Sequence, residues 1–348
     1  MLKPSRLQSI LDRAVDRTKI FGASFCVQTS QDLWAGAGGD MKTHSQFFIA
    51  STTKLFVSAV IHQLRSQNKL RLDDRAATYL EPEILRGLVV VGGTDYYNSV
   101  SIKNLLAHTS GIPDYFGQKG ADGTSLQDAL QRGIDQSWSI ETIIKKTRAL
   151  DAPFAPNTPK RAFYSDTNYQ LLGLIIERIT KQPLAQVLQE RILDPLHLEN
   201  TYMYADPTDE RPQVMRYREQ ALHIPHAMAS FTADGGMVST ASDLMTFLRA
   251  FFNGKFFPVT YLTQMYVWND IFSPLQAGIG IHRFALPWYM NPFGSIPEFV
   301  GHSGLSGTVA FFAPSKNLFI TGTVNQVAHP DAAFRLMIKL AMDISKPW

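Results

Sequence analysis

A serine and a lysine stand one helical turn apart in the run FIASTTKLFVSAVIHQL, at Ser51 and Lys54. Residues i and i+3 share one face of a helix, so the lysine amine can reach the serine oxygen. Two interpretations are open: a helix-capping serine beside a solvated lysine, or a nucleophile beside its base. Because the preceding FFIA is apolar, Lys54 would face a partly dry site and could relay the proton of the serine.

Three further runs carry side chains suited to chemistry, although packing explains each one when it is taken alone. Tyr164 in AFYSDTNYQLLG precedes a strongly amphipathic stretch, where an aromatic side chain usually packs in a core. His302 in FVGHSGLSGTVAFF stands among glycines that let a backbone approach a ligand closely. His108 in LLAHTSGIPDY stands where an apolar helix meets a glycine, and helix termination is the favoured interpretation of that run.

The spacing of apolar residues places these runs on a framework of helices and strands. Segments 7–15 and 331–344 have helical spacing, which predicts a helix near each end of the chain. Strands are expected in ASFCVQT, LWAGAGGD, GIGIHRFAL, LSGTVAFFAP and NLFITGTV, while helical periodicity prevails over about 51–200. We therefore expect an α+β fold. Residues 1–50 and about 245–348 form an antiparallel sheet flanked by the N- and C-terminal helices, and about 51–244 form an inserted, mainly helical domain.

The composition excludes several classes of protein. The chain has 348 residues, of which 45% are hydrophobic and 18% charged, an ordinary globular balance. A net charge of +3, spread along the chain, argues against a nucleic-acid partner. No apolar run is long enough to span a membrane and the N-terminus carries no evident export signal, so a cytoplasmic location is expected. The sequence does not indicate an oligomeric state.

No metal or cofactor site is expected from the cysteine and histidine residues. Cys26 is the only cysteine and lies in the apolar run SFCVQT, which predicts a small core residue rather than a reactive thiol. His223 and His226 form the closest histidine pair, but they straddle a proline and have no acidic or cysteine ligand nearby. The other histidines are scattered along the chain.

Six short runs occur in this order: STTK, LLAHTSG, YSDTNYQLLG, DPLHLENT, ADGGMVSTASDL and GHSG. Together they resemble the serine β-lactamase and penicillin-binding-protein superfamily, specifically its class C β-lactamase-like branch with esterases, D-aminopeptidases and D,D-carboxypeptidases. The resemblance spans residues 5–345. Agreement among six ordered runs favours a nucleophile over a simple helix cap at Ser51.

The resemblance implies an active site in the cleft between the two domains and a reaction that passes through an acyl-enzyme. By this resemblance Ser51 is the nucleophile, Lys54 is its partner, and Tyr164 shares the role of general base. A nearby ammonium favours a phenolate, so Lys54 is expected to bring the proton affinity of Tyr164 toward the working range. The backbone N–H groups of Ser51 and Leu305 match the oxyanion hole of the family.

Two departures from the class C pattern bear on the substrate. Asp166 stands where those enzymes carry an asparagine, and a carboxylate cannot donate a hydrogen bond unless it is protonated. His302, followed by Ser303 and Gly304, replaces the lysine of a Lys-Thr-Gly motif, so the positive charge there depends on pH. We expect these four residues to bind the substrate, and we expect weak activity on β-lactams.

The sequence therefore predicts a serine hydrolase without a cofactor, acting on a small-molecule ester or amide. A carboxylesterase on small esters is the leading hypothesis. The enzymatic alternatives are a D-amino-acid amidase or aminopeptidase, a D,D-peptidase, and a weak β-lactamase. An alternative of another class is a penicillin-binding or ligand-sensing protein without turnover, against which the intact set of Ser51, Lys54 and Tyr164 argues.

Overall fold

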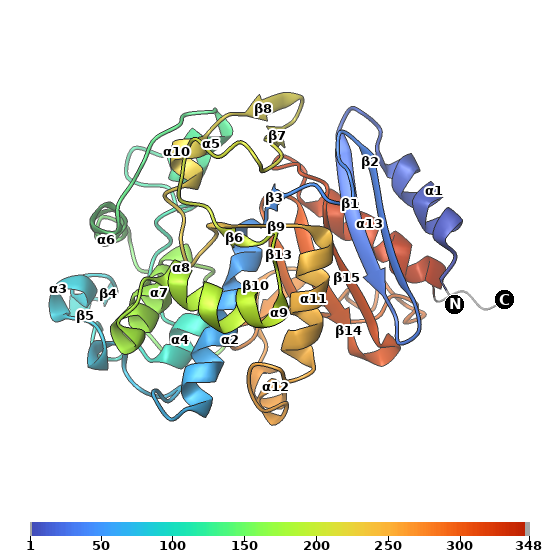
Figure 1. The fold of residues 1–348 in the computed structure, drawn as a ribbon. Coiled ribbons are helices and arrows are strands. Elements are labelled where there is room, and N and C mark those ends of the chain that lie inside the picture. The colour runs from blue at the N-terminus through green and yellow to red at the C-terminus, as the bar shows by residue number, and fades with distance from the viewer. Residues whose placement is uncertain (1, 345–348) are drawn as a thin grey trace.

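One antiparallel sheet of eight strands contains segments from both ends of the chain (Figure 1). The computed structural model describes residues 2–344. All neighbouring strands of this sheet run antiparallel. The sequence had predicted an antiparallel sheet with strands from both ends of the chain. In order across the sheet they are β10 (Asn269–Phe272), β11 (Leu275–Ala277), β12 (His282–Phe284), β13 (Phe299–Gly304), β14 (Thr308–Ala313), β15 (Leu318–Thr323), β1 (Gly22–Gln28) and β2 (Leu33–Gly39).

Helices cover both faces of the central strands. The terminal helices α1 (Pro4–Ala14) and α13 (Asp331–Ile344) contact each other and pack on one face, while α11 (Ala241–Phe252) packs on β1, β14 and β15. Successive residues of β1 point to opposite faces. Phe25 accordingly belongs to the apolar cluster of the terminal helices, whereas Cys26 belongs to the larger cluster that includes α11. Burial raises the pKa of the Cys26 thiol to about 12, so this cysteine is the core residue that the sequence predicted.

The middle of the chain is mostly helical and is built around α2 (Thr53–Ser66). Most residues of α2 are buried, as expected for a helix with apolar side chains on every side. It contacts α7 (Asp166–Thr180) and α8 (Leu184–Leu188), and α7 also contacts α4 (Ile102–Leu106). The remaining helices are α3 (Pro82–Leu85), α5 (Leu126–Gln131), α6 (Ile140–Arg148), α9 (Asp194–Leu196), α10 (Pro225–Met228) and α12 (Thr260–Met265), with a π-helical turn at Gln189–Leu193.

The predicted α+β class is confirmed, and so are the five predicted strands, although β12 is shorter than the run GIGIHRFAL. Small sheets inside the predicted helical region were not foreseen. They consist of β3 (Phe47–Phe48), β9 (Met237–Ser239) and β6 (Tyr202–Met203), and of the hairpins β4 (Val90–Val91) with β5 (Thr94–Asp95) and β7 (Met215–Tyr217) with β8 (Gln220–Leu222). Strands of two or three residues are too short to show the alternation of apolar and polar residues that predicts a strand. The domain limits at about residues 50 and 245 stay a prediction.

Among residues 2–344, no helix is both long enough and apolar enough to cross a lipid bilayer.

The buried histidine His62 in α2 gives a test of the core that is independent of function. Burial lowers the pKa of His62 to about 3, and its ring packs near Phe257 and Tyr261. Below the ordinary histidine pKa of about 6.5 the unfolded chain binds a proton that the folded chain does not, so acid removes stability. In His62→Phe this loss is absent. When the pH falls from 8 to 5, the parent should therefore lose about 2 kcal/mol more unfolding free energy than the variant.

Urea unfolding of both proteins at the two pH values measures this change. A difference between the two proteins that stays the same at pH 5 and pH 8 would show that His62 titrates normally in the folded chain.

Candidate active site

Ser51 lies in a single 3-10 turn, η1 (Ala50–Thr52), between β3 and α2. Ala50 adopts a φ of +46°, a region that residues with a side chain rarely occupy and that is often found at functional sites. Strand β13 lies directly against this turn. A Cβ atom at Gly304 would be 2.3 Å from the carbonyl oxygen of Ile49, so glycine is required for the close approach of the strand.

Ser51 Oγ receives two hydrogen bonds from side chains that are distant in sequence. Lys54 Nζ donates to it at 3.1 Å, and the hydroxyl of Tyr164 donates to it at 2.8 Å. Tyr164 is two residues before the start of α7, whereas Lys54 is in the first turn of α2. The structure thus brings together the three residues that the sequence singled out. Both partners donate to this oxygen, so either one can take the serine proton only as it gives up one of its own.

The ammonium of Lys54 has closer partners than Ser51 and Tyr164. Lys54 is fully buried, and its Nζ donates to Asp166 Oδ1 at 2.6 Å and to the backbone oxygen of Asp234. Burial, and then the charge of Asp166, raises the pKa of Tyr164 well above its ordinary value. The structure therefore contradicts the expectation that Lys54 draws Tyr164 toward phenolate, because the carboxylate neutralises the ammonium.

Two more carboxyl groups lie close to Asp166. Asp114 accepts a hydrogen bond from the backbone N–H of Asp166 at 3.0 Å. Asp234 accepts one from the hydroxyl of Tyr115 at 2.6 Å and another from the amide of Gln170 at 2.7 Å. Burial, and then the charge of Asp166, raises the pKa of both Asp114 and Asp234. Of these three carboxyl groups only that of Asp166 contacts the Lys54 ammonium, and the raised pKa values make Asp114 and Asp234 easier to protonate than an ordinary aspartate.

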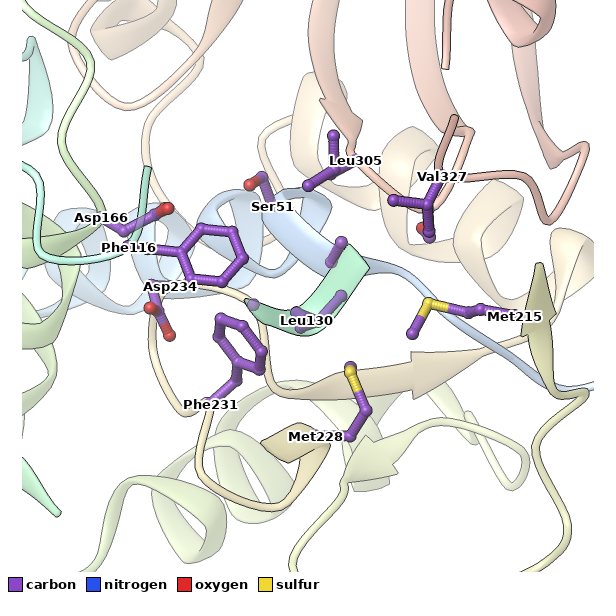
Figure 2. A pocket seen from close by; sticks show the side chains of 13 residues that line it. Ser51, Phe116, Leu130, Asp166, Met215, Met228, Phe231, Asp234, Leu305 and Val327 are labelled. Atoms are coloured by element: carbon purple, nitrogen blue, oxygen red, sulfur yellow. The ribbon is translucent and has the colours of Figure 1, made fainter. Parts of the chain in front are cut away.

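A pocket opens beside Ser51 and has one polar and one apolar side (Figure 2). The carboxyl groups of Asp166 and Asp234 lie at one end of the pocket, beside the ring of Phe116. The apolar side is formed by aromatic, aliphatic and methionine side chains, namely Phe116, Leu130, Met215, Met228, Phe231, Leu305 and Val327. A pocket with mostly apolar walls and a few polar groups at one end suits a small organic ligand with an apolar portion.

Strand β13 carries His302 past the pocket rather than into it. The His302 ring is buried, stacks on His282 with 3.8 Å between ring centres, and accepts the backbone N–H of Ser303 at 3.0 Å. Leu305 lines the pocket, whereas His302, Ser303 and Gly304 do not. Burial also lowers the pKa of His302 well below its ordinary value. The buried His302 ring therefore does not supply the predicted pH-dependent charge. Substrate binding by His302, Ser303 and Gly304 stays a prediction.

Two histidines that the sequence did not assign to the site contact Tyr164. The His108 ring stacks on the phenol ring with 4.5 Å between centres, and His282 meets it edge-on at 5.8 Å. His108 stood in one of the six runs, but its most evident role was to end a helix. His282 lies in a predicted strand whose neighbours give no sign of the site. Asp234 was also unassigned, because it contacts Lys54 through a backbone oxygen that any residue type would supply.

Within residues 2–344, no group of three or more histidine, cysteine, aspartate or glutamate side chains is arranged to hold a metal ion. The rings of His282 and His302 lie face to face, so their nitrogens do not converge on a common point. The described part of the chain thus offers no ligand set of the usual kind.

Comparison with known proteins identifies the family of this site. The family model described as Beta-lactamase matches residues 7–341. The chain belongs to the β-lactamase family. Over 326 residues it is 24% identical to a putative D-alanyl-D-alanine carboxypeptidase of Escherichia coli K12, an alignment that covers 83% of this chain and 71% of that protein. It is also 24% identical over 344 residues to esterase EstB of Burkholderia gladioli, with coverage of 88% and 83%.

The fold of this β-lactamase-family chain is that of solved relatives. The D-amino acid amidase of Ochrobactrum anthropi SV3 matches with a TM-score of 0.79 and 23% identity over 96% of this chain and 98% of the amidase. The resemblance inferred from the six runs is thereby confirmed. The chain is a serine hydrolase of the β-lactamase and penicillin-binding-protein type with a β-lactamase-like fold.

Lys54→Met tests how strongly the buried ion pair with Asp166 stabilises this site. The variant should lose about 3–5 kcal/mol of unfolding free energy at pH 8, because Asp166 is left buried without its cation. The loss should be smaller at pH 5, where raised pKa values let Asp114 and Asp234 stay protonated and reduce the repulsion. Denaturant unfolding at both pH values measures the loss.

The exposed residue Lys103 provides the control for this variant. Lys103→Met should stay within about 0.5 kcal/mol of the parent, as expected for a surface substitution. A loss in Lys54→Met as small as that of the control at pH 8 would contradict a stabilising role for the pair.

Proposed function

We propose that the protein hydrolyses small carboxylic esters with an apolar acyl group through an acyl-enzyme on Ser51. The observation that carries this proposal is the convergence of Lys54 Nζ and the Tyr164 hydroxyl on Ser51 Oγ, at 3.1 and 2.8 Å. A serine hydroxyl is a weak nucleophile until an adjacent group takes its proton. Lys54 can take this proton because it can pass one of its own protons to Asp166 Oδ1, 2.6 Å away.

In the proposed first step, Ser51 Oγ bonds to the carbonyl carbon of the ester, and its proton passes to the Lys54–Tyr164 pair as Lys54 passes one of its own protons to Asp166. The pair then gives this proton to the alkoxide oxygen as the carbon–oxygen bond of the ester breaks and the alcohol leaves. Water attacks the acyl-enzyme with the same proton transfers and releases the acid. The backbone N–H groups of Ser51 and Leu305, residues that both line the pocket, are proposed to stabilise the oxyanion.

Charge in the pocket favours an ester over a substrate that carries a carboxylate. Asp166 presents a carboxyl group to the pocket, and Lys54 is already engaged by that group. The buried ring of His302 supplies no cation in place of the lysine of related β-lactamases. A carboxylate on the substrate would therefore be repelled by Asp166 and would find no free cation in the pocket to pair with. The apolar side of the pocket instead suits an alkyl or aryl acyl chain.

Ser51→Ala and Tyr164→Phe test the assignment on p-nitrophenyl acetate and butyrate. We expect kcat to fall about 10³-fold or more for Ser51→Ala, because the nucleophile is absent. For Tyr164→Phe we expect a fall of about 10²- to 10⁴-fold, the usual range for loss of a general base. Ser66→Ala, at the exposed end of α2, is the matched control and should retain the parent rate.

Undiminished turnover by Ser51→Ala would remove the nucleophile assignment. Stoichiometric labelling of Ser51 by a fluorophosphonate, without turnover of any ester or amide, would instead favour a binding or sensing protein.

A second candidate is a D-amino-acid amidase, as the solved relative from Ochrobactrum anthropi is called. The observation in its favour is that the acidic residues Asp166 and Asp234 lie in the pocket beside Ser51, where they could attract the ammonium group of an amino-acid amide. An amino acid with an apolar side chain would also fit the other side of the pocket.

A substrate panel separates these candidates. We compare kcat/KM for p-nitrophenyl butyrate, D-phenylalanine amide and the β-lactam nitrocefin. The carboxylate of nitrocefin meets Asp166, so its kcat/KM should lie at least about 10²-fold below that of the preferred substrate. Equal rates for nitrocefin and the ester would show that Asp166 does not act on the charge of the substrate. A preference for the amide over the ester would select the second candidate.

A further inference from the structure

We infer that His108 is a positioning residue that holds the hydroxyl of Tyr164 in line with Ser51. This inference rests on the proposed role of Tyr164 as general base. It arises from the surroundings of the tyrosine: among the described residues, no helix or strand lies between the end of α6 at Arg148 and the start of α7 at Asp166. Tyr164 therefore stands at the end of a long irregular segment and needs contacts from elsewhere to fix it.

His108 contacts this segment at three consecutive residues. Its backbone oxygen accepts the N–H of Phe163 at 2.9 Å, and its Nδ1 accepts the N–H of Ser165 at 3.1 Å. Between these two hydrogen bonds its ring stacks on Tyr164, with 4.5 Å between centres and 26° between planes. One residue thus holds the backbone before and after Tyr164 together with one face of the phenol ring.

The backbone of His108 has an unusual conformation that makes these contacts possible. Its φ is +58°, in the left-handed region that is strained for a residue with a side chain. Glycine or asparagine is the usual residue in such a position after a helix. Histidine also adopts this conformation more often than most residues, and unlike glycine it brings a ring and a nitrogen acceptor to the segment around Tyr164.

The protonation state of the ring is fixed by the same contacts. Because Nδ1 accepts an N–H, it carries no proton, and the neutral imidazole holds its proton on Nε2. Within the described chain Nε2 is buried and has no hydrogen-bond partner. Burial, with the neighbouring His282 and Lys54, lowers the pKa of His108 well below its ordinary value. The contact with Ser165 thus persists at neutral pH, and His108 is not placed to exchange protons with the substrate.

Small displacements of a reacting group have large effects on rate. A shift of about 1 Å in a catalytic group can reduce turnover about 10²-fold. The hydroxyl of Tyr164 lies 2.8 Å from Ser51 Oγ, so a rotation or slide of the phenol ring would break this hydrogen bond. Removing the His108 ring should therefore act on turnover through Tyr164 rather than on substrate binding.

Two variants of His108 separate its contacts. His108→Phe keeps a flat ring but removes the Nδ1 acceptor, and His108→Asn removes the ring but suits the left-handed backbone. On p-nitrophenyl butyrate we expect each to lower kcat about 10- to 100-fold, with KM within about threefold of the parent. If His108→Phe does not fold, His108→Asn carries the test. His62→Phe, which removes another fully buried histidine, should keep kcat within about twofold.

A double-mutant cycle with Tyr164→Phe shows whether His108 acts through the tyrosine. The measured quantity is the rate of Ser51 labelling by a fluorophosphonate, which stays observable in slow variants. In the parent, the His108 substitution should lower the labelling rate at least about tenfold. In the Tyr164→Phe background, the same substitution should change the labelling rate less than about twofold.

The outcomes that overturn the inference differ from those that overturn the proposed function. Equal loss in both backgrounds, or no loss in either His108 variant while Tyr164→Phe is impaired, would sink the positioning role. Parent-like activity in Tyr164→Phe would instead remove Tyr164 as general base.

Discussion

The ion pair between Lys54 and Asp166 constrains the two central helices of the protein. Lys54 is the second residue of α2 and Asp166 is the first residue of α7, with 2.6 Å between nitrogen and oxygen. A carboxylate suits this place because the N-terminal end of each helix is electrically positive. Since separating the helices would leave a buried charge unpaired, the pair fixes their distance. Ser51, one turn before Lys54, is placed by the same constraint.

An aspartate in place of asparagine at position 166 changes more than one hydrogen bond. It makes the contact with Lys54 ionic, and it leaves the pocket without a net positive charge. Its charge also adds to the effect of burial in raising the pKa values of Asp114, Asp234 and Tyr164. One substitution relative to the class C pattern thus alters both the proton affinity of the proposed base and the charge of acceptable substrates. The apolar wall beyond Ser51 is then the main feature left to recognise an acyl group.

Local features of the sequence were enough to predict the parts that depend on spacing. The i, i+3 relation placed Ser51 and Lys54 on one face, and the apolar runs located five of the eight strands of the large sheet. The partner of Lys54 could not be predicted in this way, because Asp166 is 112 residues away and the aspartate looked like a substrate contact. The position of His282 depends on which strands are neighbours, and its register with Gly301 is a property of the folded sheet.

The pairing of β1 with β15 has a consequence for the order in which the protein is made. Cys26 in β1 lies opposite Thr321 in β15. Because β1 is near the start of the chain and β15 near its end, β1 can pair with β15 only late in synthesis. Until then the edge of β1 that later pairs with β15 is open, and an open strand edge can pair with other chains. The helices around Ser51 come from the middle of the sequence and can assemble earlier. The large sheet is therefore completed only when nearly the whole chain has been made, after the helices around Ser51.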